Sequence, residues 1–150
     1  MDTLSRAGLQ IDLPDGWDGR IYQRQAEPGV VTRRGMHAAS FALPPNIGDY
    51  ATAAVEQMQP TDMLVTLIEF DPASAGAGLF ANDGMPTAVT ADAFSPTAMP
   101  RAIPGRTAAQ YFFSSGGRAF CLYVVLGSHT GRAALLPVVN AVLGTVKIDG

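Results

Sequence analysis

The sequence predicts an α/β protein, an α+β sandwich in which a central, mainly antiparallel sheet of about six or seven strands carries two principal helices. Apolar segments of strand length recur along the chain. Two of them, 108–113 and 118–127, are separated by Ser114-Ser115-Gly116-Gly117, which is typical of a β-hairpin. Two other segments, 49–59 and 135–143, repeat apolar residues at the three- and four-residue spacing of an amphipathic helix. The 150 residues suit a single domain spanning 1–150.

Composition excludes several classes of protein. Hydrophobic residues make up 47% of the chain and charged residues 15%, the opposite of a disordered tail. The net charge of −3 argues against a nucleic-acid binder that neutralises phosphates. No apolar run reaches the ~18 residues of a membrane-spanning helix, and no basic start precedes an apolar signal-peptide core. We therefore expect a cytoplasmic protein without a membrane segment.

The first third of the chain reads as strands and turns. Residues 9–13 alternate apolar and polar side chains, as a half-buried strand does, and Pro14-Asp15-Gly16 forms a turn. Trp17 follows the turn and is expected to close one end of the core, the alternative being an exposed binding residue. Residues 19–24 return as a second strand, 30–33 form a short strand, and 37–43 form another extended segment.

A helix is expected over 49–59, with Asp49 as its N-cap and Pro60 at its end. Residues 63–70 are almost continuously apolar, which predicts a central strand covered on both faces. Glu69 is a polar exception within it. The carboxylate either reaches solvent or pairs with an arginine, or it is a raised-pKa acid in a pocket.

Residues 71–107 are rich in proline and glycine, yet too apolar for a free linker. We expect an ordered excursion with short strands at 89–94 and 101–103. Four of its large side chains are candidate partner-binding anchors, or alternatively part of the core that covers the sheet: Phe80, Met85, Phe94 and Met99.

The end of the chain predicts a hairpin, a helix and a short edge strand. Strand 118–127 is apolar on both faces and should be central. The helix opens either at Ser128–Thr130, where Pro137 would kink it, or near Ala134, where Pro137 would sit harmlessly in the first turn. Gly144 fits its end, and 146–148 form the last strand.

Chemical motifs are sparse. The phosphate-binding glycine motifs and the nucleophile elbow do not occur, so no cofactor and no catalytic residue are assigned. The single cysteine, Cys121, lies in an apolar run and is expected to be buried and unreactive. The two histidines, His37 and His129, lack carboxylates at metal-ligand spacing, so no metal site is assigned.

The opening segment from Gly8 to Trp17, with Leu13-Pro14-Asp15-Gly16-Trp17 after a strand, resembles the start of Mog1/PsbP-like domains. The ending, a long hairpin over 111–126, a helix over 135–143 and a last strand, is similar to theirs, and to uncharacterised bacterial proteins of that type. The resemblance implies a sheet sandwiched by helices and a binding or assembly role without catalytic residues. Bacterial relatives are often secreted lipoproteins, whereas this sequence has neither signal peptide nor lipobox cysteine.

The expected function is that of a non-enzymatic, cytoplasmic binding or accessory protein. Its partner is expected to be a protein or a second copy of the chain, and not nucleic acid or membrane. One alternative is a small-ligand-binding protein or hydrolase with a pocket around Glu69, Arg118 and either histidine. A second alternative is a subunit of a larger bacterial assembly, which predicts an exposed apolar patch above a few hundred Å².

Overall fold

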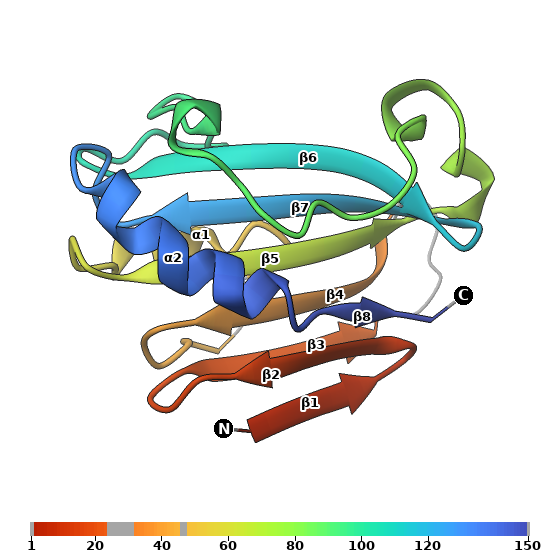
Figure 1. The fold of residues 1–150 in the computed structure, drawn as a ribbon, viewed down its shortest axis with the longest axis horizontal. Helices are drawn as coiled ribbons and strands as arrows, with labels where there is room; N and C mark the ends of the chain where they lie inside the picture. The colour runs from red at the N-terminus through yellow and green to blue at the C-terminus, as the bar shows by residue number, and fades with distance from the viewer. Residues whose placement is uncertain (1, 24–31, 46–47, 150) are drawn as a thin grey trace.

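The computed structural model describes residues 2–23, 32–45 and 48–149. Within them, strands form two antiparallel sheets, ordered β1-β2-β8 and β3-β4-β5-β7-β6 (Figure 1). The fold class expected from the sequence is confirmed, although the described residues form eight strands, divided between two sheets. The elements are β1 Asp2–Arg6, β2 Leu9–Leu13, β3 Asp18–Gln23, β4 Thr32–Ala39, α1 Thr52–Glu56, β5 Met63–Phe70, β6 Thr107–Ser115, β7 Arg118–Leu126, α2 Arg132–Leu143 and β8 Lys147–Ile148.

The larger sheet is covered on both faces. On one face, α2 and the smaller sheet pack over Val65, Leu67 and Leu122, while on the other α1 packs over Leu64 and Tyr123. Figure 1 shows α2 in front of the strands and α1 behind them. All nine residues of β7 and seven of the eight in β5 are buried, so the prediction that both strands are central is confirmed. A strand with two buried faces needs apolar side chains on both of them, which explains these near-continuous apolar runs.

The smaller sheet joins the beginning and the end of the sequence. Leu9, Ile11 and Leu13 of β2 are buried against the first core face, as their alternation predicts. The predicted last strand is confirmed as β8, which pairs with β2. Strand β1 was not expected, because its pairing depends on a tight turn and not on an apolar pattern. Ala7 and Gly8 both adopt positive φ, 55° and 77°, and return the chain as a two-residue hairpin.

Strand β4 replaces two shorter predicted segments. Residues 30 and 31 of the expected 30–33 strand lie outside the described residues, and 32–33 belong to β4. The expected segment 37–43 ends early, because β4 stops at Ala39. Trp17 lies partly buried against the first core face, in agreement with a core-closing role.

Helix α1 is much shorter than the expected 49–59, and the assignment of Asp49 as its N-cap is wrong. The helix begins after Ala51, which has a left-handed backbone with φ 53° and makes no side-chain cap. The Asp49 carboxylate instead accepts a hydrogen bond of 2.7 Å from the hydroxyl of Tyr22 in β3.

Helix α2 starts between the two predicted positions. Its N-cap is Gly131, so Pro137 stands inside the helix and not in its first turn. Leu136, Val139 and Leu143 bury the inner face of the helix, while Pro137 is exposed on the outer face. Gly144 is the C-cap, as expected.

The excursion 71–107 is ordered, but the strands expected at 89–94 and 101–103 are wrong. It contains three short 3-10 helices, Pro72–Ser74, Gly78–Phe80 and Ala91–Ala93, joined by turns. Its prolines cannot donate ladder hydrogen bonds, which favours turns over strands here. The excursion is fixed by side chains that it inserts into both core faces, Val89 and Phe94 on one and Met99 on the other.

Candidate functional site

The edge strand β6 is enclosed at its two ends by the excursion. At one end, Ser114 donates its N–H to the carbonyl of Asn82 and accepts from the N–H of Gly84, both at 2.7 Å. At the other end, Ala108 and Ser95 exchange two backbone hydrogen bonds of 2.9 and 3.1 Å. Between these two bridges the excursion leaves the edge and crosses the face of the sheet, where Val89 is held by Asn140 of α2.

The middle of this edge keeps its backbone groups open. The backbone N–H and C=O groups of Ala108 and Ser114 bond to the excursion, away from β7. In an antiparallel pair these groups alternate in direction from one residue to the next, so those of the even-numbered residues between Ala108 and Ser114 also face away from β7, while those of the odd-numbered residues bond to β7. Gln110 and Phe112 therefore direct two N–H groups and two carbonyls away from the sheet. Within the described residues, these four groups have no backbone hydrogen-bond partner. Proteins normally cover or charge such an edge, so an open stretch points to a use.

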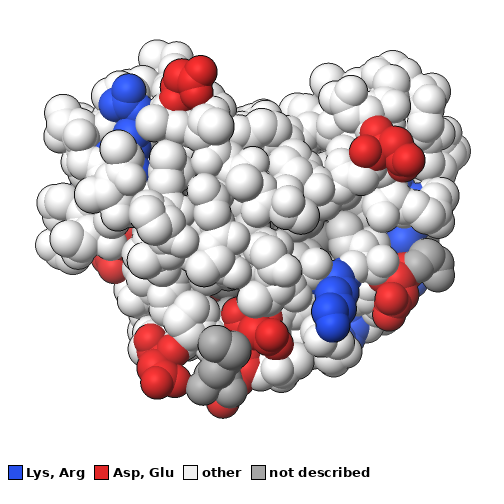
Figure 2. Space-filling model, viewed as in Figure 1, with Lys and Arg blue, Asp and Glu red and all other residues white. Residues whose placement is uncertain are grey.

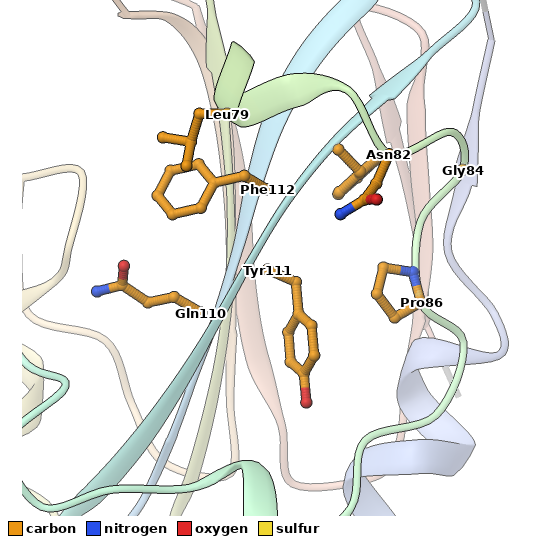
Figure 3. Close-up of a pocket in the computed structure, with 8 residues that line it drawn as sticks. Leu79, Asn82, Gly84, Pro86, Gln110, Tyr111 and Phe112 are labelled. Carbon is orange, nitrogen blue, oxygen red and sulfur yellow. The ribbon is translucent and has the colours of Figure 1, made fainter. Parts of the chain in front are cut away.

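A pocket of about 370 Å³ lies along this open stretch (Figure 3). Figure 3 shows Leu79 beside Phe112 on one side of β6, and Tyr111 and Pro86 on the other. Leu79 is 62% exposed, one of two large hydrophobic side chains exposed in the described part of the chain. The lining residues are all uncharged: Leu79, Asn82, Gly84, Pro86, Gln110, Tyr111, Phe112 and Phe113. We call this site the β6 groove.

Two carboxylates stand near the β6 groove. Asp83 belongs to the bridge that closes one end. Asp92 lies close enough to Tyr111 that it adds to the effect of burial in raising the pKa of the Tyr111 hydroxyl. Hydrogen bonds from Thr90 and from its own backbone, with the nearby Arg132, hold the pKa of Asp92 below its usual range. Figure 2 shows that charged side chains are few and scattered on the face of the molecule seen in Figure 1, and the lining of the groove itself is uncharged.

The four predicted partner-binding anchors lie mainly in the core, the alternative that the sequence left open. Phe80, Phe94 and Met99 are buried, and Met85 is partly buried against the first core face. Phe80 packs between the rings of Phe70 and Phe112, at centroid distances of 5.3 and 5.8 Å. These side chains hold the excursion in place, and the groove is lined by their neighbours.

Glu69 is engaged in a buried ion pair. The guanidinium of Arg118 donates from Nε at 2.8 Å and from a terminal nitrogen at 2.9 Å to the two carboxylate oxygens. Arg34 approaches the same carboxylate at 3.8 Å. Arg118 also donates to the carbonyls of Ala7 and Asp149, so it joins the smaller sheet to the larger one. Of the predicted alternatives, pairing with an arginine is therefore the correct one.

The histidines do not join Glu69 in a site. Side chains of β5 alternate between the two core faces, which places Glu69 with Leu67 on one face and Thr66 on the other. The buried His37 bonds Thr66 at 3.0 Å, on the face opposite Glu69. His129 follows the far end of β7 and bonds Thr107 at 2.9 Å. A hydrolytic constellation of these residues is not assembled.

Cys121 is buried as predicted, and burial raises the pKa of its thiol to about 12. The neighbouring hydroxyl of Tyr123 also has its pKa raised, chiefly by burial. Across residues 2–23, 32–45 and 48–149, no group of three or more His, Cys, Asp or Glu side chains is placed to hold a metal ion.

None of the described helices is long and apolar enough to cross a membrane. Comparisons with protein-family models, curated proteins and solved structures found no match.

Sequence reasoning missed the β6 groove. The pattern of 108–113 predicts a strand, but it does not show that this strand lies at the edge of the sheet. The available signal was Gln110, a polar residue in an apolar run. Its side chain is exposed and donates to the carbonyl of Ala98 at 2.9 Å, on the excursion.

Proposed function

We propose that this chain is a non-enzymatic binding or accessory protein that takes a protein partner at the β6 groove. The observation that carries the proposal is the open backbone of Gln110 and Phe112 beside an uncharged pocket that exposes Leu79. Apolar surface next to a few fixed polar groups is what recognition sites combine.

The chemistry of the polar side chains supports binding over catalysis. Both carboxylate oxygens of Glu69 are paired with Arg118, and the thiol of Cys121 is held protonated by burial. A general acid or nucleophile must instead be exposed to substrate and tuned close to the working pH. The alternative of a hydrolase around Glu69 would also need a histidine beside it, and His37 lies on the other face of the sheet.

The Mog1/PsbP-like resemblance is part of this proposal, together with the cytoplasm as the place of action. A binding role agrees with what that family implies, and its mixed sheet-and-helix architecture agrees with the two-faced core here. The assembly-subunit alternative is less well supported, because large exposed hydrophobics in the described residues are Leu79 and Val138 alone.

The test is native mass spectrometry of tagged protein purified at low salt from its own host. We compare wild type with Leu79→Ser in the groove and with Val138→Ser on α2, the matched control, which is 42% exposed. A protein retained at fixed stoichiometry by wild type and Val138→Ser, and lost with Leu79→Ser, is the expected result. A partner that Leu79→Ser retains equally, or a small-molecule mass in its place, would refute the proposal.

A further inference from the structure

We infer that the partner binds by strand addition: an extended peptide segment pairs with the open edge of β6 at Gln110 and Phe112. This inference rests on the proposed function and names the chemistry of its partner. Paired to β6 in the antiparallel sense, one peptide residue opposite Gln110 and another opposite Phe112 would each exchange two backbone hydrogen bonds. Three consecutive residues would satisfy all four open groups.

The length of the open edge limits what can occupy it. The two bridges at Ala108 and Ser114 are six residues apart along β6, which is about 20 Å of strand. The residues of the excursion occupy both ends of that length. A short extended segment fits between the bridges, whereas a long edge strand of a second folded subunit would meet the excursion at Asp83 and Ser95.

The two sides of the groove specify the peptide's side chains. Residues opposite one another in an antiparallel pair project from the same face. The two residues opposite Gln110 and Phe112 would therefore lie on the side of Leu79, and the residue between them on the side of Tyr111 and Pro86 (Figure 3). All three positions face uncharged and mainly apolar groups, which favours aliphatic or aromatic side chains.

The margins of the groove favour basic flanking residues. The carboxylates of Asp83 and Asp92 stand nearby, and the protein carries a net charge of −3. A lysine at either end of the segment would meet a negative field, although Arg132 partly offsets that of Asp92. The partner is accordingly an extended segment of three apolar residues with basic neighbours.

The experiment uses labelled pentapeptides with lysine at each end and Val, Ile or Phe at the three central positions, titrated by fluorescence anisotropy against the full chain. The decisive pair of variants is Gln110→Pro, which removes the outward N–H, and Gln110→Ala, which removes only the side chain. Proline is tolerated in edge strands where its missing N–H would face solvent. Both variants lose the Gln110 side chain, so the N–H is what distinguishes them, and we expect Gln110→Pro to bind about tenfold more weakly than Gln110→Ala.

A peptide control covers the case in which Gln110→Pro fails to fold. N-methylation of the first and third central residues removes the donors that face β6 and keeps every side chain, so the methylated peptide should bind wild type at least about tenfold more weakly. Amide exchange supplies a second readout. The N–H groups of Gln110 and Phe112 should exchange rapidly in the unbound protein and become protected when peptide is bound. The N–H of Tyr111 bonds to β7, so it should be protected in both states.

Three results would overturn the inference. The first is a methylated peptide that binds as tightly as the unmethylated one, and the second is that no peptide of the set binds. The third is a dimer of the chain, detected by sedimentation, in which the amides of Gln110 and Phe112 are protected without peptide. A groove-dependent partner in native mass spectrometry combined with any of these would leave the proposed function standing and reject strand addition. If Leu79→Ser retains the partner as well as wild type does, while the peptides still bind β6, the proposed function would be rejected and strand addition would stand.

Discussion

Arg118→Met tests whether the buried ion pair holds the two sheets together. Arg118 and Glu69 are 8% and 3% exposed, and the substitution leaves the carboxylate with Arg34 alone, at 3.8 Å. It also removes the donors to the carbonyls of Ala7 and Asp149. Breaking one side of a buried pair costs about 3–5 kcal/mol, a large share of the ~5–15 kcal/mol that stabilises a typical domain.

The free energy of unfolding is measured by urea titration, followed by circular dichroism and by the fluorescence of Trp17, which lies against the first core face. The matched control is the double variant Glu69→Leu with Arg118→Met, in which no uncompensated charge is buried. We expect the double variant to be more stable than Arg118→Met alone. Two results would contradict this reasoning: a loss of unfolding free energy below about 1 kcal/mol for Arg118→Met, or a loss in the double variant equal to the sum of the losses of Arg118→Met and Glu69→Leu measured singly.

Three further predictions concern the backbone and the core. Gly127→Ala places a Cβ against the backbone carbonyl of Gln59, which cannot move aside, so the free energy of unfolding should fall by about 1–3 kcal/mol and the melting temperature should fall with it. At Gly144 an added Cβ makes ordinary contacts only, so Gly144→Ala should change the free energy of unfolding by less than about 0.5 kcal/mol. Pro137→Ala should raise the free energy of unfolding by roughly 1–3 kcal/mol in urea titration, because it restores a helical hydrogen bond at an exposed position; a decrease would mean that the ring is needed for packing. The thiol of Cys121 should resist iodoacetamide at pH 8 in the native protein and react in urea; rapid labelling of the native protein would contradict its burial. Because this thiol ionises at a lower pH in the unfolded chain than in the folded one, the free energy of unfolding should decline as the pH rises from about 9 toward 12.

The sequence was informative wherever one local pattern was enough. Strand 63–70 and the hairpin with Gly116 and Gly117 were predictable, because apolar continuity and turn chemistry each determine a structure without distant contacts. Strand β1 was not, since its five residues are mostly polar and are ordered by pairing with β2. Tertiary contacts likewise decided the start of α1, where Asp49 bonds Tyr22 in preference to capping.

The candidate site was harder to predict because it is a property of the sheet order. Composition indicated that the excursion packs on the molecule, but it left open whether Phe80, Met85, Phe94 and Met99 bind a partner or belong to the core, where they mainly lie. Whether Phe80 faces a partner or the core depends on Phe70 and Phe112, which come from different strands. Whether the backbone of Gln110 is open depends on β6 lying at the edge, a fact that no single window of sequence contains.

The smaller sheet also constrains how the chain folds as it is synthesised. Strands β1 and β2 emerge from the ribosome well before β8, yet Leu9 and Gln10 pair with Ile148 and Lys147 of that strand. At typical rates of ~5–20 residues per second, the hairpin would wait on the order of ten seconds for its third strand. During that interval the apolar side chains of Leu9, Ile11 and Leu13 lack the cover that α2 later provides. Until β8 and α2 are available, the hairpin therefore exposes an apolar face, and transiently exposed surface of this kind is prone to aggregation during synthesis.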